Sequence, residues 1–332
     1  MKILRTGLLF FLSILFGAII FIYVGDAIGW DFILNSFKIF LNFEGLVVIF
    51  LSFFIAFLGA LRWKGIVKNG QNISLFNLFK IYIAGFSIQY FFPMILFGSE
   101  AFRASLLEHR EKIGWDRALA SVIIERIIEW TINILVILIG VLYFFYEVQK
   151  PSQNLALIFG VSIVFFLLIL FFVYVYLFKK NSFIKKILFK ITKKDYKEGV
   201  AIKTEKIVFE YFNIKNINLW KGYFFSILKV LAMFLRVWFI VFFLGNILNF
   251  MPSLSILGFS FLSTMVPIPT ALGVQELIQS FVFGNLNISL GTSSSFSMIL
   301  RAGDVIVSLI GCALFFKVGF EFLKNKICKN EK

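Results

Sequence analysis

Two long, uncharged hydrophobic runs limit what this chain can fold into. Residues 8–24 and 154–178 contain no charged side chain, and about 20 apolar residues are enough for an α-helix to cross a bilayer. Hydrophobic residues make up 60% of the 332-residue chain, which leaves too few polar residues to cover the surface of a soluble globule. The alternating pattern of a barrel strand does not occur. The sequence therefore predicts an all-α, polytopic helical membrane protein.

The distribution of basic residues predicts the topology. Residues 179–221 carry twelve lysines and four acidic residues, and basic loops remain on the cytoplasmic side of a membrane. Residues 2–5, the stretch just after Leu61 and the C-terminal tail are also basic, so both termini are expected in the cytoplasm, with the chain in the cell membrane. Six full spans fit this arrangement: residues 8–24, 45–61, 118–146, 154–178, 222–250 and 296–316.

Two further hydrophobic segments remain, residues 73–97 and 251–290. Each must begin and end on the same face of the membrane if the basic loops are all to stay on the cytoplasmic side. We therefore expect both to be re-entrant helical hairpins. Proline and glycine allow a chain to turn at membrane depth where protein or water satisfies the freed backbone groups. The expected hinge residues are Pro93 and Gly98 in the first hairpin, and Pro267, Pro269 and Gly273 in the second.

The two hairpins share an order of proline, glycine, acid and arginine. These residues are Pro93, Gly98, Glu100 and Arg126 in the first case, and Pro269, Gly273, Glu276 and Arg301 in the second. The proline precedes the acid by seven residues in both, and the arginine follows the acid by 26 residues in one and 25 in the other. A chance match is the alternative. The pattern predicts an inverted repeat, in which two broken helices meet near the membrane midplane.

We expect a single transmembrane domain over residues 1–332. Its parts are an N-terminal anchor helix and external loop (1–43), a first inverted half (44–146), a connecting span and basic cytoplasmic loop (147–221), and a second inverted half with a basic tail (222–332). The mixed aromatic and basic residues of that loop suggest an amphipathic helix on anionic lipid. A docking site for a cytoplasmic partner is the alternative reading.

Two strings carry a family resemblance. "GSEAFRASLL…ALASVIIERIIEW" and "PIPTALGVQE…SMILRAGDVI" resemble the transmembrane region of lysylphosphatidylglycerol synthases and related stand-alone flippase-like proteins, over about residues 61–316. In that family the first hairpin ends in Gly-Gly-Asp followed by Arg, the next helix carries Glu-Arg, and the second hairpin has a glycine-rich run before Glu. The matching positions are Gly98-Ser99-Glu100 with Arg103, Glu125-Arg126, and Pro269 through Gly273 to Glu276.

The chain departs from the family pattern at two places. Ser99 and Glu100 replace Gly and Asp, and Thr270-Ala271-Leu272 replaces the glycine-rich turn. Because a side chain keeps the backbone further from a ligand than glycine does, the turn is expected to approach a lipid head group less closely.

The charged residues of the predicted spans are the candidate site. Guanidinium binds phosphate through two hydrogen bonds, so Arg103 and Arg126 are expected to form a fork for a lipid phosphate. In the alternative, structural reading, Glu125 and Glu129 lie one turn apart and Arg126 pairs with Glu129. The predicted substrate-binding residues are Arg103, Arg126, Arg301, Glu100, Glu276, Glu125 and Arg236.

Two pairings are also expected. Arg236 lies near the middle of the span at residues 222–250, where an unpaired charge is costly, and Glu276 is its expected partner by elimination. Arg301 and Asp304 are spaced for a pair at the end of a helix. Glu276 is expected either to pair with an arginine or to receive a cationic head group.

These features favour a lipid translocase that moves a phospholipid or aminoacylated phospholipid head group between leaflets. A membrane-embedded aminoacyl- or glycosyl-transfer enzyme, or a subunit of one, is the alternative, and a purely structural partner is a third reading. His109 is the one histidine and lies in the charged stretch "LLEHREK", and no phosphate loop, metal cluster or nucleophile elbow is present.

We therefore expect no cofactor, no metal and no catalytic residue. A soluble synthase domain is also not expected, because the chain ends soon after the last predicted span. The basic residues lie beside hydrophobic segments, so their expected partner is the anionic membrane surface and not nucleic acid. A partner enzyme and the oligomeric state stay open.

Overall fold

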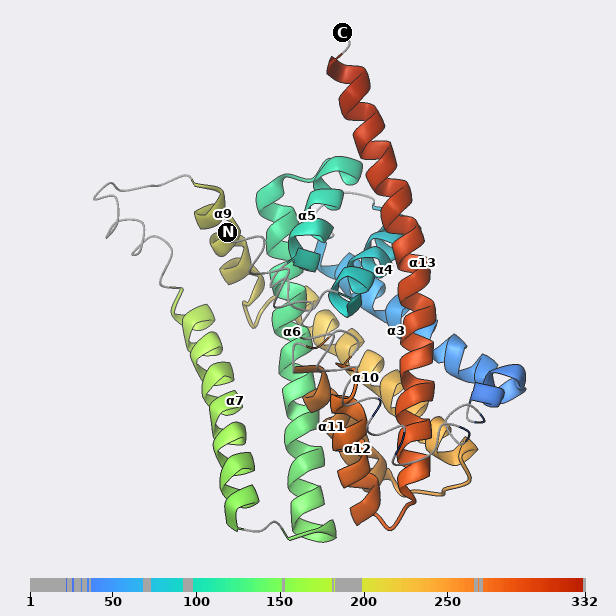
Figure 1. Ribbon diagram of the computed structural model, residues 1–332. Coiled ribbons are helices and arrows are strands. Elements are labelled where there is room, and N and C mark those ends of the chain that lie inside the picture. The colour runs from blue at the N-terminus through green and yellow to red at the C-terminus, as the bar shows by residue number, and fades with distance from the viewer. Residues whose placement is uncertain are drawn as a thin grey trace, which may run out of the picture.

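All secondary structure in the described part of the chain is helical, which confirms the predicted fold class. The computed structural model describes residues 37–67, 73–91, 98–150, 153–180, 199–265 and 271–330, with the isolated positions 22, 26, 31, 35, 182 and 268. Figure 1 shows the helices side by side along one long direction, with α13 running past the others at its C-terminal end.

The helices fall into two groups of four, joined by two more. The first half consists of α3 (Phe43–Val67), α4 (Leu75–Phe91), α5 (Gly98–Glu111) and α6 (Trp115–Tyr143), which continues as a short π-helix at Phe144–Val148. The second half consists of α10 (Ile217–Phe243), α11 (Phe250–Met265), α12 (Val274–Asn285) and α13 (Leu290–Asn330). The connecting helices are α7 (Gln153–Lys179) and α9 (Val200–Tyr211), and the short 3-10 helix at Phe37–Leu41 precedes α3.

Four described helices are long and apolar enough to cross a membrane: Phe43–Val67, Trp115–Val148, Ile217–Phe243 and Leu290–Leu314. They coincide with four of the predicted spans. The helix α7 covers the predicted span at residues 154–178, and the apolar stretch Ile163–Lys179 within it is shorter. The predicted span at residues 8–24 lies outside the described residues. The count of six spans therefore stays a prediction.

The second predicted hairpin, residues 251–290, is divided into two helices, α11 and α12. The first, residues 73–97, contains α4 among its described residues, and α5 begins directly after it. In Figure 1 α4 and α5 lie in the upper half of the molecule, and α11 and α12 lie in the lower half. The expected hinge residues Pro93, Pro267 and Pro269 lie outside the described residues, while Gly98 is the first residue of α5. Whether the hairpins are re-entrant stays a prediction.

The backbone turns sharply just before α12. Gly273 has φ +76° and Ala271 has φ +52°, both in the left-handed region that glycine adopts freely and other residues rarely do. The family resemblance predicted a glycine-rich turn at this point. Ala271 therefore adopts the left-handed backbone conformation that glycine would adopt more easily.

The two halves make corresponding contacts with each other. The helices α3 and α10 cross at the centre, while α4 packs against α13 and α11 packs against α6. In each case the first helix of a broken segment packs against the last helix of the other half. This exchange of partners binds the halves into one core, and it is the contact pattern that the predicted inverted repeat would produce by a two-fold operation.

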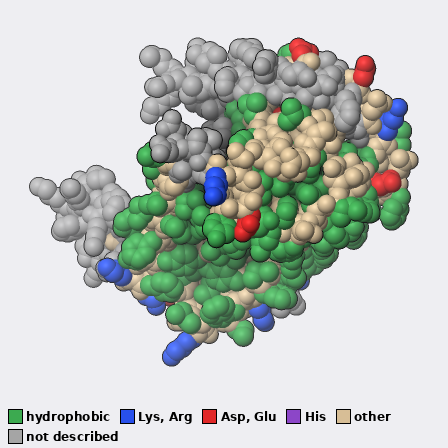
Figure 2. All heavy atoms as spheres, turned by 90° about the horizontal axis from the view of Figure 1, so that it is seen from below, with side chains coloured by type: hydrophobic (Ala, Val, Ile, Leu, Met, Phe, Trp, Pro, Cys, Tyr) green, Lys and Arg blue, Asp and Glu red, His purple; other side chains and the backbone are tan. Residues whose placement is uncertain are grey.

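The outer surface is dominated by hydrophobic side chains. Seen from below, Figure 2 shows extensive apolar surface with charged side chains only at scattered positions. On α7 the large side chains of Phe165, Leu168, Phe171 and Phe172 are exposed. Such a surface is expected where helices contact lipid chains instead of water, and it supports an integral membrane protein.

The crossing of α6 and α11 depends on the absence of a side chain at Gly140. A Cβ there would lie 2.8 Å from the Leu254 carbonyl oxygen and 3.1 Å from the Ser255 Cα. We expect Gly140→Val to destabilise the fold by about 1–3 kcal/mol, because overpacking forces the two backbones apart. The measurement is the thermal unfolding temperature of the detergent-solubilised protein.

The matched control is Gly160→Val, since a Cβ at Gly160 meets nothing within 4 Å. Both changes add the same atoms to a glycine in an apolar helix. The two variants therefore differ only in whether the added side chain lies at a helix crossing. Equal unfolding temperatures for the two variants would contradict the importance of this crossing.

Candidate functional site

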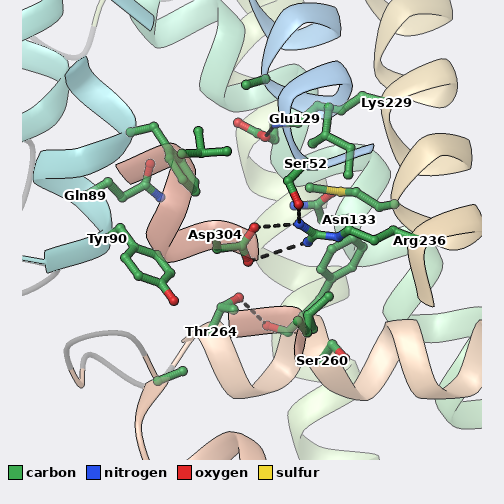
Figure 3. A pocket seen from close by; sticks show the side chains of 18 of the residues that line it. Ser52, Gln89, Tyr90, Glu129, Asn133, Lys229, Arg236, Ser260, Thr264 and Asp304 are labelled. Carbon is green, nitrogen blue, oxygen red and sulfur yellow. Dashed lines mark hydrogen bonds and ion pairs between the residues drawn. The ribbon is translucent and has the colours of Figure 1, made fainter. Parts of the chain in front are cut away.

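A cavity of about 260 Å³ lies between the two halves. Its walls are partly apolar, with polar side chains converging from α3, α4, α5, α6, α10, α11, α12 and α13. Figure 3 shows Arg236 between Asp304 and Ser52, with Glu129 and Lys229 to one side and Ser260 and Thr264 to the other. The polar lining residues are Ser52, Tyr82, Gln89, Tyr90, Arg103, Arg126, Glu129, Asn133, Lys229, Arg236, Ser260, Thr264, Gln275 and Asp304.

A cluster of seven charged residues, the larger cluster, forms one side of this cavity. It joins four cations, Arg62, Arg103, Arg126 and Lys229, to three carboxylates, Glu100, Glu125 and Glu129. Glu125 is fully buried and binds both Arg62 and, at 2.8 Å, Arg103. Glu129 binds Lys229, Arg62 at 3.2 Å and Arg126 at 3.3 Å. Arg126 also binds Glu100 at 2.6 Å.

The smaller cluster consists of two separate pairs, of which the pair Arg236–Asp304 lines the cavity. Arg301 binds Glu276 with an N–O distance of 2.6 Å, and Arg236 binds Asp304 with an N–O distance of 2.6 Å. The predicted pair of Arg236 with Glu276 is therefore wrong, as is the helix-end pair of Arg301 with Asp304. Because α13 packs against both α12 and α10, residues one turn apart on it meet partners on different helices.

The other expectation for Glu276, that it pairs with an arginine, is confirmed. The side chain is fully buried, and its partner Arg301 also lies 3.4 Å from the Ala271 carbonyl oxygen, to which it donates. Arg301 thus links the turn before α12 to α13. The acid in the middle of an uncharged segment is explained by this buried ion pair.

The ion pairs follow the two-fold relation of the helices. The pair Glu100–Arg126 corresponds to Glu276–Arg301, and the pair Arg62–Glu129 corresponds to Arg236–Asp304. Each arginine of the central helices also donates to a serine of the opposite one. Arg62 donates to Ser226 at 3.0 Å, and Arg236 donates to Ser52 at 2.9 Å. In both helices the serine precedes the arginine by ten residues.

Arg103 has the most unusual surroundings in the cavity wall. Its guanidinium lies 4.2 Å from the Trp63 ring centre and 4.8 Å from the Tyr82 ring centre, and the residue is 3% exposed. One nitrogen binds Glu125, while Nε and Nη2 have no hydrogen-bond partner among the described residues. Gly85 leaves the space for this side chain, because a Cβ there would lie 2.5 Å from its Cγ and Cδ.

The seven predicted residues all belong to the two clusters, and the predicted contact of Arg126 with Glu129 is confirmed. Their role in binding a substrate stays a prediction. Arg103 and Arg126 line the same cavity, but they bind different carboxylates, so their fork for phosphate stays a prediction.

Arg62 was missed because it was read as a charge in a cytoplasmic loop. The helix α3 continues to Val67, and Arg62 is 1% exposed within it. Lys229 and Gln89 were not among the predicted site residues, and Glu129 was considered only as a partner of Arg126. The equal serine-to-arginine spacing in α3 and α10 was the signal that would have identified Arg62.

Metal chemistry has no visible basis in this cavity. The described residues contain no group of three or more His, Cys, Asp or Glu side chains that could hold a metal ion. His109 is exposed on α5 and does not line the cavity. The arrangement suits the binding and release of a charged group.

The buried pair of Glu276 and Arg301 generates a stability prediction. We expect Glu276→Ala to cost about 3–5 kcal/mol, because it leaves a buried guanidinium without its carboxylate. The double variant Glu276→Ala/Arg301→Ala should be less destabilised than the sum of its single variants. The measurement is a double-mutant cycle by thermal unfolding in detergent.

The control pair is Lys206 and Glu210 on α9, which are exposed and 4.0 Å apart. Surface ion pairs contribute at most about 1 kcal/mol to stability, so a double-mutant cycle on Lys206 and Glu210 should show little coupling. Similar coupling in the two cycles would argue against a special role for the buried pair.

Comparison with known proteins agrees with this architecture. The family model described as lysylphosphatidylglycerol synthase TM region matches residues 8–311. A UPF0104 membrane protein of Methanocaldococcus jannaschii is 24% identical over 347 residues, covering 99% of this chain and 98% of that protein. No solved structure matches the chain. Since the family model covers most of the sequence, the resemblance seen in its motifs is confirmed, and the chain belongs to the family of the lysylphosphatidylglycerol synthase transmembrane region.

Proposed function

We propose that this protein is a lipid translocase that moves the head group of a phospholipid, or of an aminoacylated phospholipid, between membrane leaflets. The observation that carries the proposal is the charged cavity between the two halves, which both broken segments line. A head group enters such a cavity while its acyl chains stay among the apolar outer surfaces of the helices. The lipid therefore does not have to carry its charge through hydrocarbon.

The energetic cost of the cavity supports a functional role. Charged side chains are rare inside transmembrane segments and usually mark substrate or ion pathways. Here Arg103, Arg126, Lys229 and Arg236 all line one cavity. An apolar core would bind the helices together at lower cost, so structural need alone does not account for so many charges.

The two broken segments are proposed to be re-entrant hairpins that act as gates on opposite sides. Each gate has an acid on its second helix and an arginine on the following helix. The side chains of Arg126 and Glu100 are 19% and 17% exposed, whereas those of Arg301 and Glu276 are 9% and 0% exposed. The structure is thus more open at the first gate, as expected for one state of an alternating-access cycle.

A membrane-embedded aminoacyl-transfer enzyme is the alternative. Its support is the family description, which names a synthase. The described cavity lining includes no histidine or cysteine, and its two carboxylates, Glu129 and Asp304, are held in ion pairs. Translocation needs only binding, shielding and release of the head group, and we therefore prefer it.

The test is movement of fluorescent phospholipid between leaflets of liposomes containing the purified protein, followed by reduction of the label exposed outside. We expect the wild-type protein to accelerate equilibration and Arg126→Ala to slow it by at least about tenfold, which corresponds to about 1.4 kcal/mol. The reason is that Arg126 closes the first gate with Glu100 and lines the cavity.

Lys206→Ala serves as the control, because it removes one positive charge from the exposed side chain on α9, which is 77% exposed. Its rate should equal that of the wild type. Equal rates for Arg126→Ala and the wild type would overturn the proposed role of the cavity. A new lipid species in mass spectra of the liposomes, in place of relocated lipid, would instead favour the enzyme.

A further inference from the structure

The two sides of the cavity differ in three charged residues. Arg103 follows Glu100 by three residues, and the corresponding position after Glu276 is Gln279. Lys229 precedes Arg236 by seven residues, and the corresponding position before Arg62 is Ile55. Glu125 precedes Arg126, and Leu300 precedes Arg301. Everything else in the ionic network has a counterpart in the other half.

These three residues leave the larger cluster with an excess positive charge. The four pairs related by the two-fold operation, two in each half, balance one another. Arg103, Lys229 and Glu125 add two positive charges and one negative charge. Four cations therefore share three carboxylates in the larger cluster, whereas the smaller cluster is neutral. A buried excess charge calls for a counter-ion.

The excess charge includes buried hydrogen-bond donors beside the cavity that lack a partner in the described part of the chain. Arg103 is 3% exposed, lines the cavity, and has no hydrogen-bond partner for Nε and Nη2 among the described residues. Adjacent N–H groups on one edge of a guanidinium match the two oxygens of a phosphate. Gln279, at the corresponding position, instead donates to Ser260 at 2.8 Å and to the Ile256 carbonyl oxygen at 3.2 Å.

The carboxylates show the opposite situation. Each of the five acidic residues in the two clusters is already paired with at least one cation. An ammonium group that entered the cavity would have to share a carboxylate with an arginine or a lysine and would add to the excess positive charge. The described part of the site thus favours a negative charge over an accompanying positive charge.

From these observations we propose that Arg103 and Lys229 form an anion site on one side of the cavity, and that it selects phospholipids whose phosphodiester is their single charge. This inference rests on the proposed function, which it narrows from phospholipids in general to anionic ones. The phosphate binds the unpartnered Nε–Nη2 edge of Arg103, which is buried in this structure and turns toward the cavity when a ligand enters. Lys229, which donates to the Tyr82 hydroxyl at 3.0 Å, supplies the second charge. Selection follows from the asymmetry between the halves.

The other half of the protein supplies the substitutions for the test. Arg103→Gln/Lys229→Ile places on this side the residues found at the corresponding positions, Gln279 and Ile55. Glu125 keeps Arg62, and Glu129 keeps Arg62 and Arg126, so neither carboxylate is left unpaired. Arg103→Lys/Lys229→Arg preserves the charges and is the matched variant. Lys203→Gln/Lys206→Gln removes two exposed charges on α9 and controls for non-specific attraction.

The measurement is the thermal stabilisation of detergent-solubilised protein titrated with short-chain phosphatidylglycerol, short-chain phosphatidylcholine, or glycerophosphoglycerol, which has the same head group without acyl chains. We expect the wild type to bind phosphatidylglycerol about tenfold more tightly than phosphatidylcholine. The Gln/Ile variant should lose this preference, and the charge-preserving and surface variants should keep it. Glycerophosphoglycerol should bind more weakly than the lipid.

Three results would overturn the inference: equal affinity of the wild type for the two lipids, an unchanged preference in the Gln/Ile variant, or equal binding of glycerophosphoglycerol, which would indicate a site for a soluble anion. Failure of the proposed function is measured in a different experiment, the liposome assay. If the proposed function is wrong, wild-type protein in liposomes moves none of the labelled lipids, whatever the binding experiment shows. A folded Gln/Ile variant is verified by its unfolding temperature without lipid.

Discussion

A charged side chain in an apolar interior must have a partner, and this constraint organises the whole core. The unfavourable transfer of a lone charge into hydrocarbon is offset here by ion pairs that connect helices distant in sequence. Arg62 on α3 binds the carboxylates of α6, and Arg236 on α10 binds the carboxylate of α13. The same arginines donate to serines across the central crossing. Pairing thus holds each half together and also joins it to the other.

The corresponding contacts of the two halves explain why these pairs recur. In the predicted inverted repeat, equivalent residues lie on opposite sides of one axis, and the interior between them becomes a shared cavity. The exchange of partners, with α4 on α13 and α11 on α6, connects the walls of the cavity to both broken segments. If these segments act as the proposed gates, movement of one gate alters its packing against the last helix of the other half.

Much of this was predictable because membrane helices obey simple rules. Length and apolarity locate spans, and the order of proline, glycine, acid and arginine marked both broken segments and the residues Glu100, Arg126, Glu276 and Arg301, but not how these residues pair. The partners of Arg236 and Glu276 were not predictable, because elimination by sequence ignores which helix each turn of α13 faces. Arg62 was hidden for a related reason, since basic residues near the end of a span are usually loop residues.

For the proposed translocase, the shared carboxylates also affect how a lipid leaves the site. Glu129 is bound by three cations and Glu125 by two, so each cation in the larger cluster has a competing partner when a phosphate departs. A pathway must bind its substrate well enough to admit it and weakly enough to release it. An excess of one cation over a nearly balanced network meets both needs, because the phosphate gains one counter-charge while the remaining charges stay satisfied by the protein.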